Sequence, residues 1–212
     1  MTLAYPVALV SWRGVRVHPA LAAALDAACL PPHIRPTGSR SGIRTRADMA
    51  KLYPTQPART SWHEAGLAVD LSPSSVLTDA QVGPVRPAGP WLYGSVSGHL
   101  WRPVKGEPWH VQLRSTSWPD SAAGLTCAVA ELGPAWAAEA GRPATDWPRA
   151  LVMLAQGYLW RLSYLGVRGV DGLWGPATAA ALTAALPTWA PVSSVTENVL
   201  CALAEACAER GV

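Results

Sequence analysis

Two histidines and two acidic residues in this sequence have the types and the spacing of a metal-dependent catalytic site. His63 and Asp70 lie in the stretch SWHEAGLAVD, and Glu107 and His110 lie in GEPWH. Zinc in catalytic sites is commonly held by three imidazole or carboxylate ligands, which leaves a fourth position for water. Because His63, Asp70 and His110 supply such a set, the sequence predicts a site for one zinc ion.

Glu107 is the candidate general base of this site. A water molecule that zinc activates needs a carboxylate to take its proton and pass it to the leaving amine. Glu107 lies three residues before His110, between Gly106 and Pro108, which favour a turn. We therefore expect Glu107 to act on the water without binding the metal.

Glu64 directly follows His63, as in the helical zinc motif HExxH. That motif needs a second histidine at position 67, where this sequence has leucine, and Gly66 favours a turn over a helix. We therefore reject the helical motif and interpret Glu64 as a solvent-facing residue or an outer hydrogen-bond partner. The other histidines are interpreted as structural: His18, His33 and His99.

Two short strands are expected to carry Asp70 and His110. The alternating run LAVDL predicts the first strand, with Asp70 on one of its faces. Residues 104–113 predict a turn and a second strand, in which Trp109 and Val111 face a core and His110 does not. A turn at Gly66, before the first strand, lets His63 meet these two residues.

Helical segments are expected on both sides of a breaker-rich connection, 31–42. Residues 18–30 have apolar side chains at helical spacing, with Pro19 in a first-turn position. Residues 44–53 have helical composition. From about 115 to 148 the chain is rich in Ala, Gly and Pro, and we interpret it as a linker that contains a docking helix.

Three helices are predicted in the last part of the chain. The first has one apolar stripe of Leu151, Leu154, Tyr158, Leu162 and Leu165. The second covers 176–186, with Pro176 in its first turn. The third covers about 194–209, with Ser194 as N-cap and Glu197 as its capping-box partner.

The composition limits the classes of protein to which this chain can belong. Half of the residues are hydrophobic and 15% are charged, which favours a folded core over disorder. A net charge of +3 without a basic run argues against a nucleic-acid partner. We expect neither a membrane span nor a signal peptide, because apolar runs are short and the first residues lack a basic region. The four cysteines are interpreted as free core residues.

Three motifs in this order resemble a known family. SGIRT, SWHEAGLAVD and EPWH resemble the pattern SGxR, SxHxxGxAxD and ExWH of zinc peptidases that cleave peptidoglycan stem peptides. These are D-alanyl-D-alanine carboxypeptidases and L-alanyl-D-glutamate endopeptidases, relatives of the hedgehog signalling domain. The resemblance spans roughly 15–115 and implies an α+β fold with a small antiparallel sheet flanked by helices. It also implies that His63, Asp70 and His110 bind zinc and that Glu107 is the general base.

The same resemblance implies roles for residues around the metal. Arg44 would polarise the scissile carbonyl or hold the developing oxyanion, which requires a fixed positive donor. Ser61 is implied as a substrate contact, and Arg40 is either a surface residue or a contact to a substrate carboxylate. The sequence departs from the family at Ile43, where an aromatic residue is frequent, and near Met49, where glutamine is frequent.

The stretch GVDGLWGPATAAAL, 169–182, resembles the peptidoglycan-binding repeat of cell-wall hydrolases. That repeat is an all-α three-helix bundle with the motif DGxxGPxT, and the resemblance covers about 148–208. It implies wall binding by this region, for which Asp171 is one candidate contact. Trp160, Trp174 and Trp189 could stack on sugars, and Trp174 is the first choice because it lies in the loop. Asp171 can also hydrogen-bond back into the loop, and a single tryptophan is more often a core residue than a sugar-stacking one.

These observations predict a zinc peptidase domain over 1–118, a linker over 119–147 and a peptidoglycan-binding domain over 148–212. The expected activity is hydrolysis of a stem-peptide amide, with L-Ala–D-Glu preferred because lysis needs cutting near the glycan. A D-Ala-D-Ala carboxypeptidase and a non-catalytic wall-binding protein are the alternatives, and Glu107 argues against the latter.

The expected setting is a monomeric bacteriophage endolysin whose partner is bacterial peptidoglycan. Without a signal peptide, such a protein would stay in the host cytoplasm until the membrane is permeabilised and would then reach the periplasm or cell wall. A bacterial wall-remodelling enzyme with unusual export and a phage tail-associated lysin are the alternatives.

Overall fold

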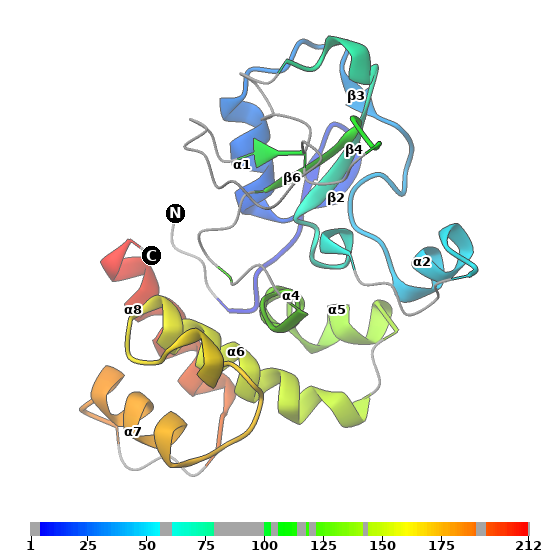
Figure 1. The fold of residues 1–212 in the computed structure, drawn as a ribbon. Coiled ribbons are helices and arrows are strands. Elements are labelled where there is room, and N and C mark those ends of the chain that lie inside the picture. The colour runs from blue at the N-terminus through cyan, green and yellow to red at the C-terminus, as the bar shows by residue number, and fades with distance from the viewer. Residues whose placement is uncertain are drawn as a thin grey trace. The chain divides into compact units, whose positions relative to one another are not determined.

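The computed structural model describes residues 5–55, 61–78, 100–102, 106–113, 118, 122–141, 144–189 and 194–211. The chain divides into two compact units: the N-terminal unit, Ala8–Ser115, and the C-terminal unit, which combines Met1–Val7 with Thr116–Val212. Seven α-helices and small antiparallel sheets lie in the described residues, which agrees with the expected α+β class (Figure 1). In the same ranges no helix combines the length and the apolar character needed to cross a membrane.

Two antiparallel sheets lie in the described residues of the N-terminal unit. β1 (Val10–Trp12) and β2 (Val15–Val17) form a hairpin. The larger sheet has the strand order β3-β4-β6-β5, in which each neighbouring pair is antiparallel. Its strands are β3 (Arg35–Pro36), β4 (Ala68–Ser72), β6 (His110–Leu113) and β5 (Leu100–Trp101).

Helix α1 (Pro19–Ala27) packs on the larger sheet through one continuous core. Leu21 and Leu25 share this buried cluster with Val69 of β4 and Val111 of β6. Full burial of such a side chain contributes roughly 1.5–3 kcal/mol to stability. The core thereby fixes the two strands whose opposite faces carry the candidate ligands.

The starts of both helices in this unit follow the signals in the sequence. His18 caps α1, because its Nδ1 accepts a hydrogen bond from the Ala20 N–H at 3.1 Å. Thr45 precedes α2 (Arg46–Leu52) and forms a capping box with Asp48. The described part of this unit also has two short 3-10 helices, η1 (Trp62–Ala65) and η2 (Ser74–Val76).

The strand expected within 104–113 is confirmed but short, because β6 begins only at His110. Val111 is buried as expected, but Trp109 is 39% exposed, so its assignment to the core was wrong. Trp109 lies in a turn in which the His110 N–H donates to the Glu107 carbonyl at 3.0 Å. The alternation of a strand therefore does not extend to Trp109.

The described part of the C-terminal unit is helical. Its α-helices are α4 (Ala122–Glu131), α5 (Gly133–Glu139), α6 (Trp147–Arg161), α7 (Pro176–Ala185) and α8 (Glu197–Arg210). Two short 3-10 helices precede α6 and α7: η3 (Ala144–Asp146) and η4 (Val167–Gly169).

From the sequence, the segment 119–147 is interpreted as a linker that contains a docking helix, and the structure has two α-helices in its described residues. This segment contains α4 and α5, and α4 packs against α6, where Cys127 Sγ donates to the Met153 carbonyl at 3.1 Å. A Cβ on Gly157 of α6 would lie 2.9 Å from Cys127 Sγ. Small residues therefore let the two helices approach closely.

The helix starts in this unit match the sequence signals in one case out of two. α7 begins with Pro176 in its first turn, as expected. α8 begins later than expected, because Thr196 and not Ser194 is its N-cap and accepts from the Val199 N–H at 3.4 Å. Glu197 is therefore the first helical residue instead of the third.

All four cysteines are free, as expected. Cys127 and Cys207 are buried, and Cys201 is half-buried. Cys29 is exposed, so its assignment to the core was wrong. Its positive φ of 48° places it in the turn that follows α1, where the chain leaves the core.

A buried glutamine on α6, Gln156, fastens the loop between η4 and α7. Its amide nitrogen donates to Asp171 Oδ1, the Leu173 carbonyl and Thr178 Oγ1, each at 3.0 Å. Its amide oxygen accepts from the N–H groups of Asp171 and Gly172 at 3.0 and 2.7 Å. One side chain thus joins this loop and the first turn of α7 to α6.

Replacing Gln156 with alanine is expected to destabilise the C-terminal unit by roughly 2–4 kcal/mol, because several buried loop groups would lose their partner. Thermal unfolding followed by circular dichroism measures this effect. Asn198→Ala on the exposed side of α8 is the control and should change stability by less than about 0.5 kcal/mol. Unfolding of Gln156→Ala at the wild-type temperature would contradict the assigned role.

Candidate metal centre

Strand pairing places two of the three candidate ligands directly opposite each other. In the β4–β6 ladder Asp70 pairs with His110. Directly opposed residues of an antiparallel pair project from the same face of the sheet. The carboxylate and the imidazole therefore meet on the face opposite the one that buries Val69 and Val111.

His63 reaches the same point from η1, the short helix before β4. Gly66 caps the end of η1, and its φ of +66° turns the chain into β4. A Cβ on Gly66 would also lie 2.8 Å from the backbone nitrogen of His18. The turn thus requires glycine both for its backbone conformation and for this close approach.

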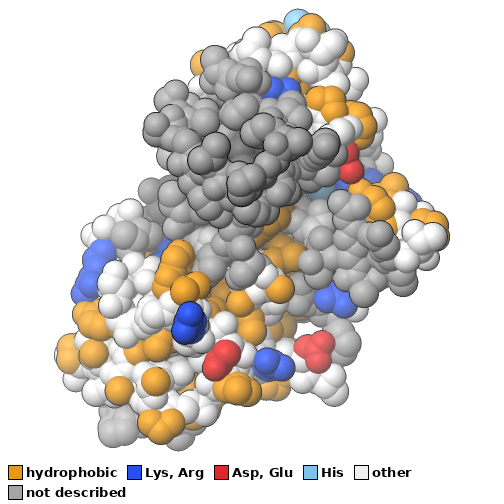
Figure 2. All heavy atoms as spheres, viewed as in Figure 1, with side chains coloured by type: hydrophobic (Ala, Val, Ile, Leu, Met, Phe, Trp, Pro, Cys, Tyr) orange, Lys and Arg blue, Asp and Glu red, His pale blue; other side chains and the backbone are white. Residues whose placement is uncertain are grey.

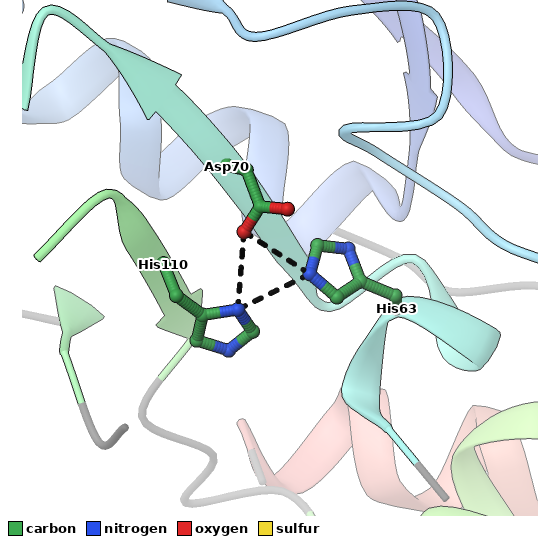
Figure 3. A group of neighbouring side chains, drawn as sticks. All are labelled: His63, Asp70 and His110. Carbon is green, nitrogen blue, oxygen red and sulfur yellow. Dashed lines mark hydrogen bonds and ion pairs between the residues drawn. The ribbon is translucent and has the colours of Figure 1, made fainter. Parts of the chain in front are cut away.

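The three side chains converge on one point (Figure 3). His63 Nε2 lies 3.2 Å from His110 Nδ1 and 3.4 Å from Asp70 Oδ1, and His110 Nδ1 lies 3.2 Å from Asp70 Oδ1. In a tetrahedral zinc site with bonds of about 2.0–2.1 Å, neighbouring ligand atoms are about 3.3 Å apart. The separations fit three corners of such a tetrahedron, so the predicted ligands form one buried group that could hold a metal ion.

The Gly42 carbonyl determines which nitrogen of His63 is available to a metal. His63 Nδ1 lies 2.7 Å from this carbonyl oxygen. Because a carbonyl can only accept, Nδ1 carries the proton, and Nε2 presents its lone pair towards Asp70 and His110. A metal-binding histidine is commonly oriented in this way by a backbone carbonyl. Lone pairs that point together need a proton or a cation between them, which fits a metal site.

Burial and neighbouring charges set the protonation states of two ligands. Burial lowers the pKa of His63 below its ordinary value, although the Asp70 carboxylate opposes this shift. Burial alone would raise the pKa of Asp70, but the neighbouring imidazoles of His110 and His63 and the charge of Arg44 hold it well below its usual range. A neutral His63 and an anionic Asp70 are the forms that a metal requires.

Residues 41–44, the SGIR stretch, lie directly behind the ligands. The Ser41 carbonyl accepts from the Asp70 N–H at 3.0 Å, and the Arg44 N–H donates to the His63 carbonyl at 3.0 Å. The Arg44 guanidinium also pairs with Asp70 Oδ2 through Nη2. Arg44 thus contacts two ligands in this structure, and the oxyanion role implied by the resemblance stays a prediction.

Ser61 and Glu64 form a capping box at the start of η1. The Ser61 hydroxyl accepts from the His63 N–H at 3.4 Å, and Glu64 Oε1 accepts from the Ser61 N–H at 3.2 Å. Glu64 is buried, and its Oε2 lies 3.6 Å from Arg46 Nε. Of the two interpretations of Glu64, the solvent-facing one was wrong, and the role of an outer hydrogen-bond partner of the metal site stays a prediction. The substrate contact expected for Ser61 stays a prediction.

Glu107 and Arg40 lie in two separate loop segments. Glu107 is half-buried in the turn that leads into β6, where its carbonyl accepts from the His110 N–H at 3.0 Å. Arg40 has a side chain that is 55% exposed, and its Nε lies 3.2 Å from Asp48 Oδ1. The roles of Glu107 as base and of Arg40 as substrate contact stay predictions.

Asp171 closes its own loop in the C-terminal unit. Its Oδ1 accepts from the Leu173 N–H at 2.8 Å and from Gln156 Nε2 at 3.0 Å, and these bonds lower its pKa. Leu173 is exposed and Trp174 is half-buried. Figure 2 shows hydrophobic side chains scattered among polar ones over the visible face of this unit. Ligand binding by Asp171 and Trp174 stays a prediction.

Sequence reasoning missed two groups that organise these sites, Gln156 and the Gly42 carbonyl. Gln156 carried no signal for burial, because at about 100° per residue it lies on the side of α6 opposite the predicted apolar stripe, where a polar residue is expected to be exposed. A backbone carbonyl has no signal either, because every residue type supplies one.

Comparison with known proteins finds no match to a protein-family model, to a curated protein or to a solved structure. The fold and the site define a mixed α and β protein with a buried group of two histidines and one aspartate that could hold a metal ion. Its function is therefore inferred from this geometry and from the sequence motifs.

Zinc is expected to stabilise the metal-free protein by roughly 2–3 kcal/mol at a concentration about 100 times its Kd, because it binds only the folded site. Differential scanning fluorimetry with and without zinc measures the shift in Tm. His110→Gln and His63→Gln should lose the shift, and His33→Gln, which changes an exposed histidine, should keep it. An undiminished shift in His110→Gln would exclude His110 as a ligand.

The metal-free N-terminal unit is expected to lose stability as the pH falls below about 6.5, the ordinary pKa of histidine. The lowered pKa of His63 means that the unfolded chain takes up a proton there before the folded chain does. Urea unfolding in chelator between pH 7.5 and 5 measures this loss, which is at most about 1.4 kcal/mol per pH unit for one group. His63→Gln should flatten the dependence, and a slope equal to the wild type would count against this assignment.

Proposed function

We propose that this protein is a zinc-dependent peptidase that hydrolyses an amide bond in the stem peptide of bacterial peptidoglycan. The observation that carries the proposal is the convergence of His63, Asp70 and His110 within 3.2–3.4 Å of one another. The order of the SGxR, SxHxxGxAxD and ExWH motifs supports the choice of substrate. We favour the L-Ala–D-Glu bond, because cutting there releases the stem peptide close to the glycan.

The side chains around the proposed metal have complementary tasks. When bound, a zinc ion supplies Lewis acidity to the scissile carbonyl and to the attacking water. Glu107 takes a proton from that water and passes it to the leaving amine. Arg44 lies beside the ligands and supplies guanidinium N–H donors for the charge that develops on the carbonyl oxygen.

The C-terminal unit would hold the enzyme on its polymeric substrate. Gln156 and Asp171 make the DGLWG loop rigid, and this loop presents an exposed Leu173 and a half-buried Trp174. A rigid loop binds with less loss of conformational entropy than a mobile one. Attachment to the wall raises the effective concentration of the peptidase at its next substrate.

The setting that we propose is a monomeric bacteriophage endolysin. It would remain in the host cytoplasm until the membrane is permeabilised, and it would then act in the periplasm or at the cell wall. The combination of a wall-cleaving site with a separate wall-binding unit supports this proposal, because lysis requires many cuts in one polymer.

Glu107→Gln is expected to lower the rate of peptidoglycan hydrolysis about 10²–10⁴-fold, since the amide cannot accept the proton of the attacking water. Clearance of a suspension of purified cell walls measures the rate, and co-sedimentation checks that the variant still binds walls. Glu205→Gln, an exposed change on α8, is the matched control and should clear walls at the wild-type rate. Wall clearance by Glu107→Gln at that rate would refute the assigned base.

Mass spectrometry of the digested walls identifies the bond from the new termini. A new D-Glu amino terminus supports the endopeptidase. Release of free D-alanine instead would identify a carboxypeptidase, and wall binding without new termini would identify a non-catalytic wall-binding protein.

A further inference from the structure

Arg44 connects two of the three candidate ligands. Its backbone N–H donates to the His63 carbonyl at 3.0 Å, and its Nη2 pairs with Asp70 Oδ2. The side chains of Arg44 and Asp70 are each only 10% exposed, so water screens this ion pair little. The pair therefore constrains the orientation of the Asp70 carboxylate.

The two oxygens of Asp70 have different partners. Oδ1 lies 3.2 Å from His110 Nδ1 and 3.4 Å from His63 Nε2, so it faces the other ligands. Oδ2 faces the Arg44 guanidinium. A carboxylate can bind a metal through one oxygen or through both, and here the guanidinium engages the second oxygen.

The guanidinium is itself held in place. Arg44 Nε donates to the Arg40 carbonyl at 2.6 Å, while Nη2 is engaged by Asp70. Two contacts on different nitrogens fix the plane of the guanidinium, which a lysine ammonium on a flexible stem cannot reproduce. The backbone of Asp70 is held by the same stretch, because its N–H donates to the Ser41 carbonyl at 3.0 Å.

We propose that Arg44 is a positioning residue that makes Asp70 a one-oxygen metal ligand. Three single-atom donors then leave one corner of a tetrahedral metal open for water or the scissile carbonyl. This inference rests on the metal site of the proposed function, and it gives Arg44 a task that acts through Asp70, in addition to any direct contact with substrate.

Cobalt(II) is the probe for this inference, because four-coordinate cobalt absorbs visible light more strongly than five- or six-coordinate cobalt. Arg44→Met should weaken the visible absorption of the cobalt-loaded protein, since Asp70 can then bind through both oxygens. Competition with a chromophoric chelator should show a loss of zinc affinity of about tenfold or more. Arg40→Met, which removes an exposed arginine side chain but keeps the carbonyl that Arg44 contacts, is the matched control and should retain the wild-type spectrum and affinity.

Arg44→Lys keeps the positive charge and provides a second test if Arg44→Met does not fold, which circular dichroism would show. Its cobalt absorption should lie between those of the wild type and of a five-coordinate site. The cobalt spectrum decides the outcome: a wild-type spectrum in either folded Arg44 variant, whatever its affinity, would overturn the inference. If the wild-type protein itself binds neither cobalt nor zinc, the proposed metal site fails, and that result is distinct from an unchanged spectrum in the variants.

Discussion

The antiparallel pairing of β4 with β6 sets the position of Asp70 opposite His110, and the candidate metal centre depends on this register. A slip of one residue in either strand would turn its ligand towards the core face. Val69 and Val111 prevent such a slip, because their burial beneath α1 would be lost at the same time. The aliphatic core thus determines the register, and the register determines which polar atoms meet.

A buried carboxylate beside two imidazoles is costly unless each polar atom has a partner. The SGIR stretch supplies several of these partners from a loop distant in sequence from both strands. The Gly42 carbonyl engages Nδ1 of His63, and the Arg44 guanidinium engages the outer oxygen of Asp70. The other ligand atoms are His63 Nε2, His110 Nδ1 and Asp70 Oδ1, and they point towards one another. A divalent cation would stabilise this arrangement.

The C-terminal unit shows the same dependence on one buried polar group in a different setting. Gln156 satisfies several backbone and side-chain groups of the DGLWG loop, so that loop is held without a large core of its own. Nearby, Gly157 lets α4 approach α6 closely through Cys127. A region poor in aliphatic residues can therefore pack its helices closely, because small residues can pack as densely as large ones.

The sequence by itself determined which side chains could bind a metal and where most helices and the two ligand-bearing strands lie, because donor chemistry, capping and periodicity are local properties. It identified His63, Asp70 and His110 by their types and spacing. Only the tertiary structure decided that the Arg44 side chain faces Asp70 and that Trp109 lies outside the core. Those outcomes depend on contacts between residues far apart in the chain and on where each strand begins, and no local pattern records either.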